Sequence, residues 1–82
     1  MKTPFIDKNG KQIEVGHILI DNDKDGELVT VHFGEYIAGH DDWGVDFVCY
    51  GFYIVWSDGT AYSLTQNGKG YSKDAGKLLI QS

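Results

Sequence analysis

The hydrophobic pattern is strongest at residues 45–56, VDFVCYGFYIVW, where every residue except Asp46 is apolar, aromatic or glycine. Its length and its aromatic and β-branched content predict a strand, and the turn-forming residues 57–60 predict a hairpin with a second strand at 61–64. Both faces of the predicted strand are apolar, which is unusual for an antiparallel sheet with one face in water. Residues 45–56 are therefore expected to be the centre of the fold.

Gly51 interrupts this strand and leaves two interpretations open. A kink at Gly51 would let each half of the strand face one enclosed core, as in small closed barrels. Alternatively, one face of a flat strand is an interface for another chain.

Shorter elements are predicted on both sides. Residues 5–13 predict a hairpin, because Asn9-Gly10 tolerates the positive φ of a type I′ turn. Residues 28–33 alternate cleanly and are expected to continue past a bulge to residue 37. The other expected elements are strands at 17–20 and 78–80 and a helical or 3-10 turn within 71–76.

Together these elements predict one all-β domain over residues 1–82. Eleven glycines against one proline favour a turn-rich β protein over helices. The chain is short for a sandwich. We therefore expect a small SH3-like barrel of five or six antiparallel strands with a short 3-10 turn before the last strand.

The cysteine content and the N-terminus bear on the compartment. A single cysteine, Cys49, excludes an internal disulfide and fits a reducing environment. The first ten residues lack the apolar segment of a secretory signal, and no apolar run is long enough for a membrane-spanning helix. The expected location is the cytoplasm of a bacterial host cell.

The charge distribution bears on whether the partner is a nucleic acid or a protein. The net charge is −5, and all seven basic residues are lysines. Residues 21–46 hold eight acidic residues against Lys24, a local balance of −7. Such a segment repels a phosphate backbone and attracts a basic surface. The absence of arginine further disfavours direct nucleic-acid binding, so a protein with a basic surface is the expected partner.

The acidic segment also contains half of a calcium-loop motif, DNDKDG at 21–26. Asp21, Asp23 and Asp25 occupy the first, third and fifth positions, but the twelfth is His32 instead of the usual glutamate. These three aspartates form a weak metal candidate, and a solvated hairpin loop is the simpler interpretation. No cofactor is expected, and no signature of a nucleophile with its base identifies an enzyme.

Trp43 stands out in the predicted loop 38–44, where acidic residues and glycine flank it. Tryptophan is enriched at binding hot spots, so we expect it to anchor a partner. The alternative is that Trp43 folds back as a lid on the core. The predicted partner-binding residues are Glu35, Tyr36, Asp41, Asp42, Trp43 and Asp46.

Residues 5–19, FIDKNGKQIEVGHIL, resemble the beginning of YopX-like proteins of phages and prophages. The similar features are the Asp7-Lys8-Asn9-Gly10-Lys11 turn, the Gly16-His17-Ile18 start of a strand, and Val31-His32-Phe33. The resemblance covers about the first 37 residues, and His17 stands where an aspartate is commoner. It implies a small β-barrel from a phage or mobile element, and brings no catalytic residues.

These observations predict a non-enzymatic phage or mobile-element protein that binds a host protein through its acidic, Trp-bearing loop. An inhibitor of a host defence or nucleic-acid-binding protein would fit this description. The alternative is a homo-oligomeric β-barrel that binds a small ligand or simply self-assembles.

Overall fold

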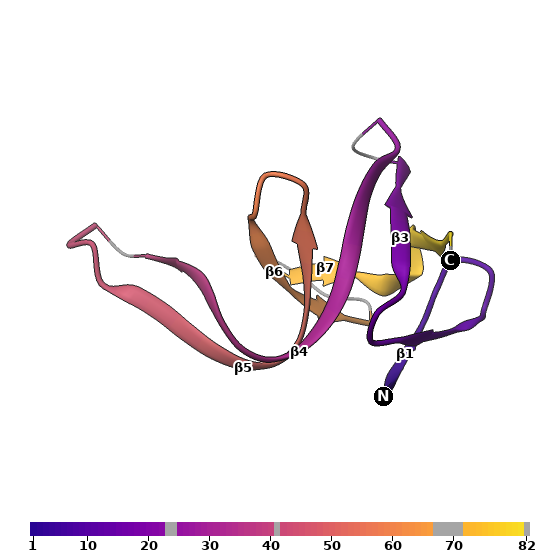
Figure 1. Ribbon diagram of the computed structural model, residues 1–82, viewed down its shortest axis with the longest axis horizontal. Coiled ribbons are helices and arrows are strands. Elements are labelled where there is room, and N and C mark those ends of the chain that lie inside the picture. The colour runs from indigo at the N-terminus through magenta and orange to yellow at the C-terminus, as the bar shows by residue number, and fades with distance from the viewer. Residues whose placement is uncertain (23–24, 41, 67–71, 82) are drawn as a thin grey trace.

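The computed structural model describes residues 1–22, 25–40, 42–66 and 72–81, and of His40 the backbone alone. This part of the chain is all-β apart from one 3-10 turn (Figure 1). The first hairpin consists of β1 (Lys2–Ile6) and β2 (Gln12–Glu14). The remaining elements are β3 (Ile18–Asp21), β4 (Glu27–His40), β5 (Asp46–Trp56), β6 (Ala61–Thr65), β7 (Ser72–Asp74), η2 (Ala75–Lys77) and β8 (Leu78–Ile80).

The last six strands form one sheet in the order β7-β6-β5-β4-β3-β8. Its pairs are antiparallel except β6 and β7, which run parallel. The all-β class and a six-stranded sheet agree with the prediction. The described residues form eight strands in all rather than five or six, and the β6–β7 pair is parallel rather than antiparallel. The missed strand β7, Ser-Lys-Asp, is polar throughout, so it lacks the hydrophobic alternation by which strands are recognised. The predicted 3-10 turn before the last strand is confirmed.

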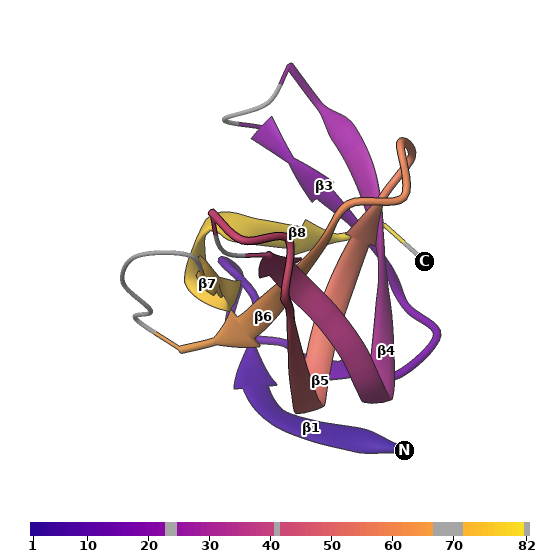
Figure 2. The same cartoon turned by 90° about the vertical axis from the view of Figure 1, so that its left-hand side faces the viewer.

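The sheet is open in the described part of the chain, because no pairing joins its end strands β7 and β8. These two strands are nevertheless consecutive in the chain, separated by the three residues of η2. The Asp74 side chain accepts a hydrogen bond from Gly76 N (2.9 Å) and caps this turn. A sheet whose two ends are joined by one short turn must curl, and Figure 2 shows β7 and β8 running across the curled strands.

The core lies inside this curl. Alternate residues of β4 and β5 supply its centre, as Val29, Val31, Ile54 and Trp56 all point inward. The rest of the buried cluster comes from the flanking strands and η2: Ile13, Leu19, Leu64, Ala75 and Leu78. No helix in the described residues is long and apolar enough to cross a membrane.

Asp7 fastens the β1–β2 hairpin to β8. Its Oδ1 accepts hydrogen bonds from Asn9 N (2.9 Å) and Lys11 N (2.8 Å), and its Oδ2 accepts one from Ile80 N (3.1 Å). Burial alone would raise the pKa of Asp7. The hydrogen bonds from these three backbone N–H groups and the charge of Lys11 outweigh burial and hold the pKa below the usual 3.8.

Candidate protein-binding site

The hairpin of β4 and β5 extends beyond the strands that flank it. The two strands pair from Val29–Trp56 to His40–Asp46, whereas β6 covers β5 at residues 53–55 alone. On the other side, β3 covers β4 at residues 27–30 alone. The far half of the hairpin therefore extends beyond the rest of the molecule (Figure 1). The whole molecule is 40 Å along its longest axis. We call residues 34–51 the arm and the remaining described residues the body.

A cross-strand pair of glycines marks where the arm begins. Gly34 faces Gly51, with φ angles of 139° and 150°, a region that side chains other than glycine rarely adopt. No atom lies within 4 Å of where a Cβ would stand on either residue, so the requirement for glycine is torsional. Figure 1 shows the hairpin bending away from the body along this stretch. A kink at Gly51 was one of the two interpretations of the sequence, but the observed bend does not enclose the far half of β5 in the core.

One face of the arm turns back toward β6. The Tyr36 hydroxyl hydrogen-bonds to Ser63 Oγ, and the Tyr36 ring stacks on Tyr53 with 4.4 Å between centroids. His32 stacks on Tyr53 at 5.3 Å, so three rings on this face support the base of the arm. Tyr36 is only 8% exposed. It was predicted to contact a partner, but its buried side chain holds the arm instead.

The opposite face continues the core side of the sheet into solvent. The cross-strand pairs Phe33–Phe52, Glu35–Tyr50 and Ile37–Val48 place these six residues on one face. Val48 is 59% exposed and Tyr50 75%. Tyr50 is exposed because, within the described ranges, no second layer covers the sheet beyond Phe52.

The tip of the arm carries most of the predicted partner-binding residues. Trp43 is 89% exposed, which excludes the alternative of a lid on the core. Asp42 and Asp46 are exposed beside it, and Glu35 is exposed further down the arm. Asp41 lies outside the described residues. Residues 34–51 contain no lysine or arginine, so the field around Trp43 is negative.

The weak metal candidate is not assembled by the described residues. The Asp21 carboxylate is buried and forms an ion pair with Lys73 Nζ at 2.8 Å. Asp25 lies exposed in the β3–β4 turn with φ of 56°, and Asp23 lies outside the described residues. No group of three or more histidine, cysteine or acidic side chains in the described ranges is placed to hold a metal ion.

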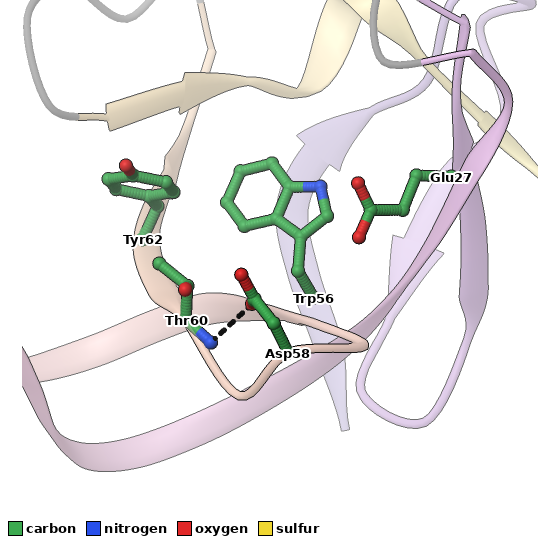
Figure 3. Close-up of a pocket in the computed structure, with 5 residues that line it drawn as sticks. All are labelled: Glu27, Trp56, Asp58, Thr60 and Tyr62. Carbon is green, nitrogen blue, oxygen red and sulfur yellow. Dashed lines mark hydrogen bonds between the residues drawn. The ribbon is translucent and has the colours of Figure 1, made fainter.

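A small pocket that sequence reasoning did not anticipate opens beside the β5–β6 turn (Figure 3). Its volume is about 110 Å³, and its lining residues are Glu27, Trp56, Asp58, Thr60 and Tyr62. Asp58 Oδ1 accepts a hydrogen bond from Thr60 N (2.9 Å), while Trp56 and Tyr62 meet edge to face. The pocket is small, and the Glu27 and Asp58 carboxylates in its lining favour a cationic group over an anionic one.

A larger hollow separates the arm from the body. Residues 37–39 of β4 line one side and residues 59–62 of the β5–β6 turn line the other, around about 460 Å³. Small side chains and glycine dominate this lining, which keeps the hollow open. The arm and the β5–β6 turn thus form the two sides of a groove near the acidic tip.

Fold and site define a small β domain from which a two-stranded, acidic and aromatic arm projects. No family model matches the chain, and no curated protein or solved structure is significantly similar to it.

Proposed function

We propose that the protein is a non-enzymatic binding module whose arm tip engages a protein with a basic surface. The observation that carries this proposal is the 89% exposure of Trp43 between exposed acidic residues, on an arm without a basic residue. A monomer gains nothing from a tryptophan held in water, whereas a binding surface does.

The tryptophan and the acids would have different tasks. Covering most of an exposed tryptophan removes about 200 Å² from water, which contributes on the order of 5 kcal/mol before the costs of association. A surface ion pair contributes about 0–1 kcal/mol. Trp43 would therefore set most of the affinity. Asp42, Asp46 and Glu35 would accelerate encounter with a basic partner and reject acidic ones.

The likeness of residues 5–37 to YopX-like proteins supports a phage, prophage or mobile-element origin. The partner would then be a host protein of the bacterial cytoplasm. Nucleic-acid-binding and defence proteins carry basic grooves of the kind that an acidic arm can occupy and block. The Asp7 turn gives the shared motif a physical basis, because the Asp7 carboxylate binds the turn and β8 together.

We further infer that the body is an incompletely closed barrel of the SH3-like type. The support is the curl of the six-stranded sheet, whose end strands are joined by the 3-10 turn Ala75–Lys77. The arm would then be a long hairpin of that barrel, extended beyond the body.

The test is an affinity capture from bacterial lysate with paired baits. We expect a protein that the wild-type chain retains and Trp43→Ala does not, and that elutes as salt rises. Asp42→Asn should slow its association in surface plasmon resonance with the purified partner. Asp25→Asn removes the same charge from an exposed turn of the body, where asparagine tolerates the positive φ, and should change nothing.

Retention that is equal on wild-type and Trp43→Ala baits, with salt-independent binding, would show that the tip is not the binding surface. Slowing of association by Asp25→Asn as much as by Asp42→Asn would assign the effect to net charge alone.

A further inference from the structure

We propose that a second copy of this chain pairs with the outer edge of β5 in the arm, so that two arms form one four-stranded antiparallel sheet. The proposal concerns the side of the arm rather than its tip, and it stands independently of the partner proposed for Trp43.

The hydrogen-bond pattern identifies which backbone groups this edge offers. Val31 directs its backbone away from β5, since its N–H donates to His17 O (3.1 Å) and its C=O accepts from Gly16 N (2.9 Å). Ile54 faces Val31, so its backbone likewise points away from β4, toward Tyr62 of β6. Because the direction of the backbone N–H and C=O groups alternates from residue to residue along a strand, those of Val48 and Tyr50 also point away from β4. The β6 pairing ends at Tyr53, so the N–H and C=O groups of Val48 and Tyr50 meet no strand of the described residues.

This edge lacks the usual protection against another strand. Natural edges carry lysine, proline or inward-pointing charges that discourage pairing. In its open stretch, residues 46–52, Asp46 at one end is the only charged residue, and there is no proline. The open edge of β4 differs, because Glu35 lies in its middle and would face Glu35 of the partner subunit in a centred antiparallel pairing.

The edge is also complementary to itself. The open stretch 46–52 is centred on Cys49, so full antiparallel overlap of two copies places Val48 opposite Tyr50 of the partner subunit. Each of these pairs would exchange two backbone hydrogen bonds, which uses every outward group of Val48 and Tyr50. A contact of this kind has twofold symmetry, needs one patch only and closes as a dimer.

The arm has a physical need for such a neighbour. An isolated two-stranded ribbon is marginally stable in water, and a third strand or a packed layer is needed to support it. Beyond the Gly34–Gly51 pair, the ribbon has Tyr36 as its one buried side chain among the described residues of the arm.

The size of the contact predicts its strength. The exposed parts of Phe47, Val48 and Tyr50 amount to on the order of 400 Å² per copy, using about 150–250 Å² for each aromatic side chain. Complete burial of these parts would give a contact of about 800 Å² in total, which is below the roughly 1,200 Å² at which stable specific interfaces begin. The dimer should therefore be weak, with the chain monomeric at low micromolar concentration and paired near millimolar concentration.

Sedimentation equilibrium of the whole chain, over concentrations from low micromolar to near millimolar, tests the pairing. We expect the wild-type mass to rise toward twice that of the chain. Val48→Pro removes an outward N–H from the proposed contact and should remain monomeric throughout. Ile37→Pro is the matched control: Ile37 faces Val48, is similarly exposed (53%), and directs its N–H to the opposite edge. It should dimerise like the wild type.

A short bismaleimide that links two thiols gives a second readout, because the proposed register sets Cys49 opposite Cys49 of the partner subunit. Cross-linked dimer should form in wild type and Ile37→Pro, and disappear in Cys49→Ser and Val48→Pro. Far-UV circular dichroism of each variant checks that it is folded. Trp43→Ala should self-associate normally, which separates this contact from the tip.

A wild-type chain that stays monomeric at near-millimolar concentration would overturn the proposal. Equal dimerisation of wild type and Val48→Pro would assign self-association to another surface. Loss of dimer in Ile37→Pro but not in Val48→Pro would assign it to the edge of β4.

Discussion

The body and the arm are built from the same two strands, yet they use apolar side chains in opposite ways. On one face of β5, Ile54 and Trp56 are buried, whereas Val48 and Tyr50 of the same face are exposed. The alternation along the strand does not change between the two halves. What changes is the second layer, which covers the sheet in the body, whereas no described residue forms such a layer beyond Phe52.

This difference shows that an alternating apolar strand specifies a face, and that the rest of the fold decides whether the face is core or contact surface. Exposed apolar faces on a small protein are typical of interaction sites. The body can therefore be expected to govern stability, and the arm to govern association. Four predictions test that division, in order of the largest effect that each one expects.

The largest expected difference in the free energy of unfolding is between substitutions of two isoleucines, one in the body and one in the arm. Ile54→Ala leaves a cavity at a fully buried site and should lower the free energy of unfolding by about 2–5 kcal/mol. Ile37→Ala removes the same atoms from a half-exposed position on the arm and should change it by about 0.5 kcal/mol or less. Urea denaturation followed by tryptophan fluorescence measures both. Equal losses would show that the arm is as well packed as the body.

Asp7→Asn should lower the free energy of unfolding by about 2–3 kcal/mol at pH 7, because it weakens three hydrogen bonds to a charged, buried acceptor. The folded pKa of Asp7 is depressed, so its stabilisation is present above the unfolded value near 3.8 and is lost as pH falls through the folded pKa. The gap between wild type and variant should narrow in denaturation curves below about pH 4. A gap independent of pH would contradict the role of ionised Asp7.

Gly51→Ala should cost about 1–3 kcal/mol, because alanine is strained at φ of 150°. The relief available to the chain is to straighten the arm, which would separate Tyr36 from Ser63. Nuclear Overhauser contacts between these two residues should weaken, and the radius of gyration should increase in small-angle scattering. A variant with unchanged stability and contacts would show that the bend does not depend on glycine.

The last prediction concerns the hydrogen bond that supports the arm on the body. Tyr36→Phe keeps the stacked rings and removes the hydrogen bond to Ser63, which should cost about 1 kcal/mol. Amide hydrogen exchange should accelerate in residues 35–50 and stay unchanged at the core positions around Ile54. Uniform acceleration over the whole sheet would mean that arm and body open as one unit.

Much of the body was predictable, because local signals there agree with one another. Asn9-Gly10 located the first turn, although Gly10 has a positive φ and Asn9 does not, so the turn is not the type I′ turn that was predicted. The alternation at residues 28–33 located the start of β4, and the 3-10 turn before β8 was expected. The parallel strand β7 was not, because the Ser-Lys-Asp segment has backbone pairing without an apolar signal.

The arm could be predicted only in part, for a physical reason. Its strand character and the role of Gly51 were readable, as was the exposure of Trp43 in an acidic setting. The pairing of Gly51 with Gly34 across the hairpin could not be predicted, because this register depends on where the chain turns between residues 40 and 46. The burial of Tyr36 depends on Ser63, which is distant in sequence.

The glycine pair at the base of the arm also has a mechanical consequence. From Gly34 to His40, β4 is about 20 Å long at about 3.3 Å per residue. A rotation of about 10° at its base therefore displaces the far end by about 3–4 Å. The position of Trp43 therefore depends on the backbone torsions of Gly34 and Gly51, which lie far from the tip that would contact a partner. Substitutions at that joint can redirect the protein to a differently shaped target while every contacting residue stays the same.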